Sequence, residues 1–352
     1  MEHATWMQRC LQLAANGAGS VAPNPMVGAV LVQGDRILAE GWHRAHGGPH
    51  AEVECLYTFG DGAIPADAMM YVSLEPCSHT GLTPPCADLL IARGLRTVVV
   101  GCTDPDPRVA GQGIVTLRGA GIAVITDVLG EKCRWQNRRF ITSVEQQRPY
   151  IILKWARSSD GFLDQHPRKG RAVQRISSFT SDVLMHRWRS EEQAIMVGSR
   201  TVLNDDPRLN VRHVAGRSPM RVVLDRYAAS PTASKVFTDG APTLLFTAQK
   251  RTDVEVEQVV IAPESDPLST LLKELHRRKV RSVLVEGGGE LLGHFIAAGL
   301  WDEAREIVSD VLLQQGTAAP RMTTTPLRSF TSGSDHIHLY TRTEAPDPAW
   351  HW

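Results

Sequence analysis

Four residues in the first quarter of the chain have the types and spacing of a catalytic zinc site. His50 and Glu52 form a His-x-Glu pair, and Cys77 and Cys86 follow in the stretch LEPCSHTGLTPPC. One imidazole and two thiolates would give a zinc ion three protein ligands and leave its fourth position open for water. A carboxylate beside that water can take its proton and return it to a leaving amine. The four residues together predict zinc-dependent hydrolysis, with one Zn2+ per chain and Glu52 as the proton carrier.

Neighbouring residues leave other interpretations open. His43 and His46 lie close to His50 in the sequence, and either could be the ligand or a surface histidine. Cys55 could be a core residue, because free cysteine packs as a small hydrophobe. Cys55 or His79 as a fourth ligand would close the site, and closed four-ligand sites are usually structural. A zinc-stabilised binding protein without activity is therefore the alternative to an enzyme.

The predicted elements explain how these residues could meet. The stretch PHAEVECLYTF predicts a helix from His50, because proline suits a helix start and an acidic residue suits the positive end of its dipole. Cys77 closes a predicted strand, AMMYVSLEP, and Cys86 opens a helix that begins near Pro85. Residues 3 to 16 predict an amphipathic helix, and MVGAVLVQGDRILAEGWH predicts a hairpin. With the later strands LRTVVVGC and GIAVITDV, the alternation predicts an α/β sandwich with a mostly parallel sheet.

A second α/β pattern begins after the polar run at residues 145–149, so we expect the linker near residue 147 and domains at 1–147 and 148–352. Its predicted strands are YIILKWA, QAIMVGS, MRVVLD, PTLLFTA and RSVLVEGGG. The polar stretch at 160–178 has no clear period and is expected to be a long loop.

Composition limits the classes of partner. The 352 residues include 38 Lys+Arg and 38 Asp+Glu, so the formal net charge is zero and nothing favours nucleic acid or an anionic membrane. The sequence contains neither a secretory signal pattern nor a long apolar segment, so we expect a cytoplasmic protein. All six cysteines fall in the first 133 residues, which favours a metal or catalytic role there over a disulfide framework.

The N-terminal motifs then identify a family resemblance. PNPMVGAV, PHAEVECL, LEPCSHTGLTPPC and DPDPRVAGQGI together resemble the deaminase half of the bifunctional riboflavin-biosynthesis deaminase/reductase family. Zinc nucleobase deaminases share the His-x-Glu and Pro-Cys order, but have two residues between the cysteines where this chain has eight. The resemblance implies a cytidine-deaminase-like α/β/α sandwich, with Asn24 and His79 contacting a phosphoribosylaminopyrimidine. Leu82 stands where the family often has Lys or Arg. A nucleic-acid deaminase, the rival within enzymes, would predict the short cysteine spacing and a basic excess.

The C-terminal half has weaker signals of its own. VEGGGELL, at the end of a predicted strand, could cradle a phosphate or be an ordinary strand-helix turn. Together with LKWARSSDG and EEQAIMVGSRTVLNDDPRLNVR, it resembles the reductase half of the same family, which has a dihydrofolate-reductase-like α/β fold and uses NADPH. The resemblance implies cofactor contacts from Ala156, Thr201, Asp205, Gly287, Gly288 and Gly289. It implies substrate contacts from Lys154, Arg189, Leu209, Arg212 and Glu286.

The predicted protein is thus a two-domain cytoplasmic enzyme with a small-molecule substrate. We expect hydrolytic deamination of a diaminopyrimidinone ribosylamine phosphate, followed by NADPH reduction of its ribosyl chain to ribityl. Neither nucleic acid nor membrane is an expected partner, and a homo-oligomer, dimer or tetramer, is expected.

Overall fold

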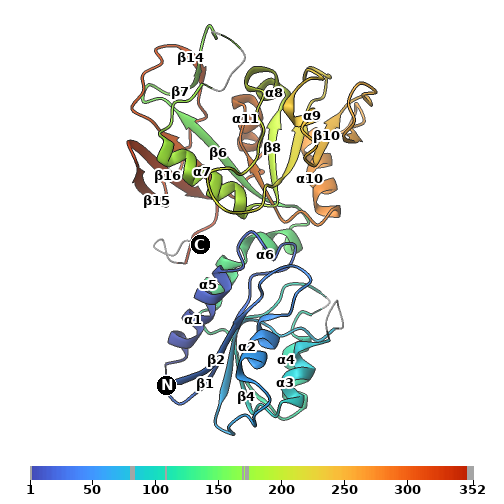
Figure 1. Ribbon diagram of the computed structural model, residues 1–352, viewed down its shortest axis with the longest axis vertical. Coiled ribbons are helices and arrows are strands. Elements are labelled where there is room, and N and C mark those ends of the chain that lie inside the picture. The colour runs from blue at the N-terminus through green and yellow to red at the C-terminus, as the bar shows by residue number, and fades with distance from the viewer. Residues whose placement is uncertain (1, 80–83, 108, 169, 171–173, 347–352) are drawn as a thin grey trace. The chain divides into compact units, whose positions relative to one another are not determined.

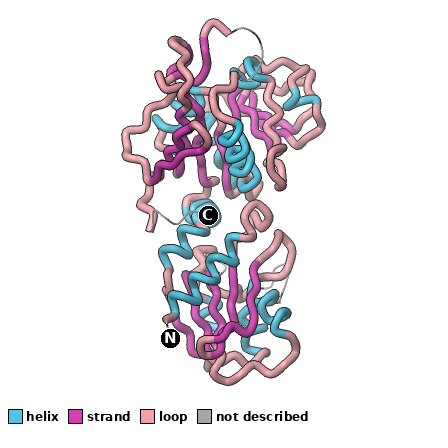
Figure 2. The backbone as a smooth tube through the Cα atoms, turned by 60° about the vertical axis from the view of Figure 1, so that its left-hand side comes forward, coloured by secondary structure: helices cyan, strands magenta, loops and turns pink. Residues whose placement is uncertain are grey.

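The structure, a computed structural model, describes residues 2–79, 84–107, 109–168, 170 and 174–346 (Figure 1). These residues form two compact units, and the division falls between Gln147 and Arg148. Each unit contains one large sheet with helices beside it (Figure 2). Among the described residues, no helix combines the length and apolar composition that crossing a membrane requires.

The N-terminal unit is built on a five-stranded sheet in the order β2-β1-β3-β4-β5. The strands are β1 (Gly28–Gln33), β2 (Arg36–Trp42), β3 (Met69–Leu74), β4 (Thr97–Cys102) and β5 (Ala123–Ile125). The predicted hairpin is confirmed as β1–β2. β1 also pairs antiparallel with β3, whereas β3, β4 and β5 are mutually parallel. Four of the five strands therefore run in one direction and only β1 runs against them, so the sheet is mixed but mostly parallel, as expected.

Helices cover both faces of this sheet. They are α1 (His3–Ala15), α2 (Ala51–Phe59), α3 (Cys86–Ala92), α4 (Gln112–Gly119), α5 (Gly130–Gln136) and α6 (Arg138–Glu145). One core cluster joins α2, α3 and α4 to Ala29 and Leu31 of β1. A second cluster joins α1 and α5 to Val30 and Val32, which point to the opposite face of the same strand. Because side chains of β1 alternate between the two faces, helices pack on both sides of the sheet and form the expected α/β/α sandwich.

The C-terminal unit contains a nine-stranded sheet in the order β11-β10-β9-β8-β12-β6-β13-β16-β15. Its strands are β6 (Tyr150–Arg157), β8 (Ala194–Gly198), β9 (Met220–Leu224), β10 (Thr243–Thr247), β11 (Glu257–Val260), β12 (Ser282–Val285), β13 (Glu303–Val308), β15 (Arg328–Ser332) and β16 (Asp335–Thr341). Neighbouring strands from β11 to β13 are parallel, and β13–β16 and β16–β15 are antiparallel. All five strands predicted for this half are confirmed.

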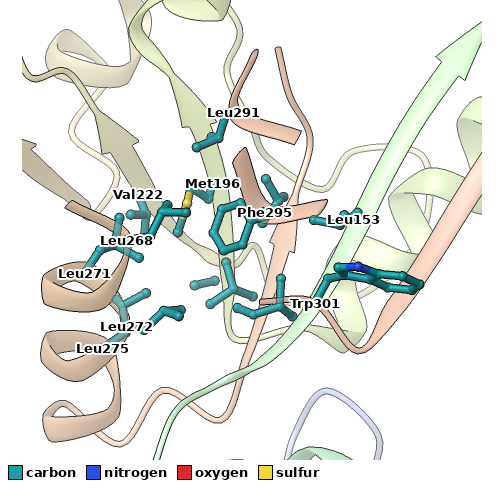
Figure 3. Close-up of a cluster of buried hydrophobic side chains, with 14 of the residues drawn as sticks. Leu153, Met196, Val222, Leu268, Leu271, Leu272, Leu275, Leu291, Phe295 and Trp301 are labelled. Carbon is teal, nitrogen blue, oxygen red and sulfur yellow. The ribbon is translucent and has the colours of Figure 1, made fainter. Parts of the chain in front are cut away.

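The helices of this unit are α7 (Phe179–Glu191), α8 (Ser199–Asp205), α9 (Lys235–Thr238), α10 (Pro267–Arg277) and α11 (Gly289–Ala297). The leucines of α10 and residues Leu291 and Phe295 of α11 pack against Met196, Val222 and Trp301 in the largest core cluster (Figure 3). Val202 of α8 belongs to another cluster, with residues of β8, β9 and β10. The sheet is thus buried by helices on more than one side, as parallel sheets require.

One expected loop contains a strand. Phe162–Gln165 forms β7, which pairs antiparallel with β14 (Gly316–Ala318) in a separate two-stranded sheet (Figure 1). The expectation of a loop throughout 160–178 is therefore wrong for these residues. Their pairing partner lies about 150 positions further along the chain, where local periodicity cannot reveal it.

Candidate active sites

Three elements of the N-terminal unit bring the predicted zinc ligands together. His50 is the residue directly before α2, Cys77 follows the end of β3, and Cys86 is the first residue of α3. Nδ1 of His50 lies 3.6 Å from Sγ of Cys77 and 3.3 Å from Sγ of Cys86. Nitrogen and sulfur ligands of a tetrahedral zinc ion lie about 3.6 Å apart, given their usual bond lengths. The three side chains therefore fit a zinc ion.

The first residues of α3 hold Cys77 in place and favour its thiolate form. The amide of Cys86 donates to Sγ of Cys77 at 3.3 Å, and the amide of Ala87 donates to its carbonyl at 3.1 Å. A hydrogen bond from the Cys86 thiol, assisted by His50, holds the pKa of Cys77 well below its usual value. Because the thiolate is the form that binds metal, this environment favours ligation.

Glu52 lies beside the ligands within the first turn of α2. Only 3% of its surface is exposed, and burial raises the pKa of its carboxyl to about 7. Cys86 is among the groups that interact electrostatically with this carboxyl. A bound cation would pull the pKa down again, so the carboxyl would be ionised near neutral pH and able to accept a proton from water.

Asn24, predicted to contact substrate, is held next to the ligand helix. Its Nδ2 lies 3.2 Å from Nε2 of His43, and Nδ1 of His43 lies 2.8 Å from the carbonyl of Pro49. Burial lowers the pKa of His43, so the neutral ring donates to Pro49 and accepts from Asn24. The side chain of Asn137 bonds both the amide and the carbonyl of Met26, at 2.8 and 2.9 Å. His43 is thus a support for this loop, and sequence reasoning missed Asn137 entirely.

The structure also places the other candidate ligands. His46 is exposed, and Cys55 is fully buried with its thiol donating to the carbonyl of Ala39 at 3.4 Å. Within the described residues, only His50, Cys77 and Cys86 form a group of three metal-binding side chains. Nδ1 of His79 is buried and has no hydrogen-bond partner among the described residues, so it is available to bind a substrate. Leu82 lies outside the described residues.

Zinc content distinguishes Cys77 from Cys55. We expect the purified protein to hold about one zinc ion per chain after dialysis against a weak chelator, and a Cys77→Ala variant to hold almost none. A Cys55→Ala variant is the matched control and should keep its zinc, because that thiol bonds a strand carbonyl in the core. Equal zinc in both variants, measured by elemental analysis, would contradict the ligand assignment.

The predicted cofactor residues gather at one edge of the C-terminal sheet. Ala156 is near the carboxyl end of β6, and Gly287–Gly289 follow the carboxyl end of β12. Thr201 and Asp205 lie on α8, which directly follows β8. β8, β12 and β6 are adjacent parallel strands. Ligands of open α/β sheets bind outside the carboxyl ends of such strands.

The turn at Gly287–Gly289 lets a bound cofactor approach the protein backbone closely. Gly287 has a φ of +117°, which favours glycine, and its carbonyl accepts from the amide of Gly198 at 3.0 Å. A Cβ at Gly288 would come within 3.3 Å of Oγ1 of Thr201, and one at Gly289 within 3.0 Å of Leu163. A side chain would thus crowd α8 if it stood at Gly288 and β7 if it stood at Gly289. The nine-residue helix α11 starts here, and helix amides bind phosphate groups, so the turn fits a dinucleotide cofactor.

Asp205 has a protein partner that the sequence did not predict. Its Oδ1 lies 2.5 Å from Nη2 of Arg168, and Nη1 of the same arginine lies 3.1 Å from Oδ2 of Asp164 on β7. Arg168 therefore ties the segment that contains β7 to the end of α8.

A buried charged cluster lies beside this turn. The guanidinium of Arg189 on α7 binds both carboxylate oxygens of Glu286, at 2.6 and 2.7 Å, and donates to the carbonyl of Asn210 at 3.0 Å. Although burial works to raise it, the charge of Arg189 lowers the pKa of Glu286 to about 2. Lys154 on β6 is also buried, which lowers its pKa, and its Nζ lies 3.1 Å from Sδ of Met185. Buried groups with strongly shifted pKa values cluster at functional sites, which makes this cluster a candidate substrate site.

The two remaining predicted substrate residues differ in exposure. Leu209 is 3% exposed and packs in a core cluster with Val202, so little of its side chain can meet a ligand. Arg212 is exposed, and its Nη1 donates to Oδ1 of Asn210 at 3.1 Å. Of the two arginines predicted to contact the substrate, Arg212 presents its guanidinium to solvent, whereas Arg189 is paired with Glu286.

Comparison with known proteins agrees with both halves. Residues 1–102 match the family described as the cytidine and deoxycytidylate deaminase zinc-binding region, and residues 149–329 match the RibD C-terminal domain. The riboflavin biosynthesis protein RibD of Aquifex aeolicus is 37% identical over 319 residues, 88% of each chain. That of Synechocystis is 38% identical over 325 residues, 90% of this chain and 86% of the relative.

Solved structures agree as well. A diaminohydroxyphosphoribosylaminopyrimidine deaminase/5-amino-6-(5-phosphoribosylamino)uracil reductase from Thermotoga maritima is 34% identical, with a TM-score of 0.84 over 96% of this chain and 98% of that one. RibD of Acinetobacter baumannii is 33% identical, with a TM-score of 0.87 over 97% and 99%. Fold, sites and relatives define a zinc-dependent deaminase joined to a reductase in one chain. The chain belongs to the RibD family and is a bifunctional deaminase/reductase of riboflavin biosynthesis, as its motifs predicted.

Proposed function

We propose that the N-terminal domain removes an exocyclic amine from a diaminopyrimidinone ribosylamine phosphate, and that the C-terminal domain reduces the ribosyl chain to ribityl with NADPH. The observation that carries the first half is the three-ligand group of His50, Cys77 and Cys86 with the buried carboxyl of Glu52 beside it. Three ligands leave zinc a position for water, which a structural site would not. The Thermotoga relative is named for these two activities.

In the deaminase domain, a bound zinc ion would lower the pKa of a water molecule toward neutrality. Glu52 accepts the proton of that water as its oxygen adds to the amine-bearing ring carbon. The same carboxyl then delivers the proton to the amine nitrogen as the C–N bond breaks and ammonia leaves. Asn24, held by His43, and the unpartnered nitrogen of His79 orient the pyrimidine.

In the reductase domain, a nicotinamide cofactor supplies the hydride and the protein supplies orientation and charge. Gly287–Gly289 and Thr201 would hold the cofactor, and Lys154 and Glu286 would face the ribosyl group. Arg212 suits the substrate phosphate, because an exposed guanidinium can bind two of its oxygens. The family resemblance supports NADPH as the particular donor. We also propose a cytoplasmic location and a homo-oligomeric state, of which light scattering on the purified protein tests the second.

The test is an assay of both steps in one tube, with purified protein and the diaminopyrimidine substrate. We expect ammonia to appear first and NADPH oxidation to follow it, with NADH oxidised more slowly. Ammonia without NADPH oxidation would contradict the proposed reduction. No ammonia from protein with zinc bound would contradict the proposed deamination.

A further inference from the structure

Glu75 is a buried carboxylate on the turn between β3 and the zinc ligand Cys77. It directly follows Leu74, the last residue of β3, and is 4% exposed. Its amide donates to the carbonyl of Cys102 on the neighbouring parallel strand β4, at 2.9 Å. Among the residues that the structure describes, no lysine, arginine or histidine forms an ion pair with it. A buried carboxylate without a cationic partner is costly unless hydrogen bonds compensate it.

Backbone amides supply that compensation. Oε1 of Glu75 accepts from the amides of Gly113 and Ile114, at 2.9 and 3.2 Å. Oε2 accepts from the amides of Gly111 and Asp104, at 2.9 and 3.2 Å. Hydrogen bonds to an ionised acceptor are among the strongest in proteins. The first turn of α4 also carries partial positive charge, so the carboxylate is well placed there. One side chain thus fixes both ends of the loop at 104–111.

The same turn is in tight contact with α4. A Cβ at Gly113 would lie 1.9 Å from the carbonyl oxygen of Pro76, so only glycine allows this approach. On the other side, Cys77 is held by the amides of Cys86 and Ala87 at the start of α3. The residues Glu75 to Cys77 are therefore held between two helices. The α4 side of that arrangement depends on the carboxylate of Glu75.

We propose that Glu75 is a positioning residue of the deaminase. Its carboxylate fixes the turn that presents Cys77, together with Asp104 and Gly111 at the two ends of the loop that follows β4, and β4 is parallel to the strand that precedes Cys77. Glu75 acts through Cys77 and that loop, without touching metal or substrate. This inference rests on the proposed deaminase function, which gives the geometry of Cys77 its importance. Groups that orient metal ligands in this way typically change metal affinity or activity about 10- to 100-fold when replaced.

The test compares Glu75→Gln with Glu54→Gln in the full-length protein. Glutamine keeps the shape of Glu75 but turns an NH2 group toward two of the four amides, so those bonds fail. Glu54 is a matched control on α2, where it pairs with the exposed Arg44 at 3.1 Å. For Glu75→Gln we expect ammonia release to fall about 10- to 100-fold in kcat/KM. Reduction of already deaminated substrate should be unchanged, and Glu54→Gln should match wild type in both assays.

Two measurements that need no substrate show whether Glu75 positions the metal ligand or only stabilises the fold. With cobalt(II) in place of zinc, the visible absorption reports ligand geometry, and we expect it to change for Glu75→Gln alone. Amide exchange at Asp104, Gly111, Gly113 and Ile114 should also accelerate in that variant. If Glu75→Gln does not fold, Glu75→Asp keeps the charge on a shorter arm and should shift the same spectrum. An unchanged cobalt spectrum in the folded variant would overturn the proposal, whereas inactive wild type would contradict only the proposed function.

Discussion

A Glu52→Gln variant should release ammonia about 10²- to 10⁴-fold more slowly than wild type, the usual contribution of a general acid–base group. Glutamine fills the same buried space beside Cys86 but cannot take a proton from water or return one to the leaving amine. The loss should appear in kcat, because the proposed substrate contacts of Asn24 and His79 remain. Steady-state ammonia release at saturating substrate measures it.

Two controls make this result specific. The same preparation should keep its zinc and should still oxidise NADPH with already deaminated substrate, since the reductase residues lie in the other unit. Glu54→Gln, two residues further along α2, should retain nearly full activity because Glu54 forms only a partly exposed ion pair with Arg44. A Glu52→Gln variant with more than about a tenth of wild-type activity would fall outside that range and remove Glu52 from the proton-transfer role.

The zinc-ligand candidates could be predicted because their signals are local. His50 comes directly before a helix and Cys86 begins one. Proline and acidic residues nearby predict both helix starts from the sequence. Cys77 follows a strand whose apolar run is plain in the sequence. Parallel strands and their following helices then place such residues at one edge of the sheet, as the α/β class requires.

Contacts between distant segments gave no such signal. Asn137 bonds Met26 across 111 positions, and nothing near Asn137 marks it as a support for the Asn24 loop. β7 pairs with a strand about 150 residues later, and Arg168 of the adjoining segment binds Asp205. Such partners depend on the whole fold, so residue type and spacing could not specify them.

The sequence also failed to predict the partner of Arg189, although Arg189 itself was named as a substrate residue. Its guanidinium suits phosphate, and the sequence offered no reason to expect an internal carboxylate. The structure pairs it with Glu286, each side chain being 8% exposed. The family resemblance singled out both Arg189 and Glu286, but only the three-dimensional structure shows that they bind each other.

A Glu286→Gln variant should lose both stability and activity in the reductase domain. Removing one member of a buried ion pair leaves the other charge uncompensated and typically costs about 3 to 5 kcal/mol. We therefore expect a large loss of stability in urea unfolding of the reductase domain, together with loss of NADPH oxidation. Ammonia release should persist under conditions where the domain is destabilised. Glu290→Gln is the matched control, because Glu290 pairs with Arg200 on the surface and exposed pairs contribute at most about 1 kcal/mol.

The pH dependence of stability gives a further check on the same group. The pKa of Glu286 is lowered to about 2 in the folded state, against an unfolded value of about 4.3. Its contribution is therefore fully present above about pH 4.5 and is lost as the pH falls toward about 2, amounting to about 3 kcal/mol. Wild type should lose this much more stability than Glu286→Gln across that interval. Parallel curves for the two proteins would show that the carboxylate is not stabilised by Arg189.

A double variant separates stability from chemistry at this pair. Replacing both partners of a buried ion pair by apolar residues is often neutral or stabilising, because neither member of the pair is left as an uncompensated charge. Arg189→Leu combined with Glu286→Leu should therefore recover much of the stability that Glu286→Gln loses. If Glu286 faces the ribosyl group as proposed, NADPH oxidation should remain absent in the stable double variant. Recovery of both stability and reduction would instead show that the pair only supports the fold, and that Lys154 and Arg212 suffice for the substrate.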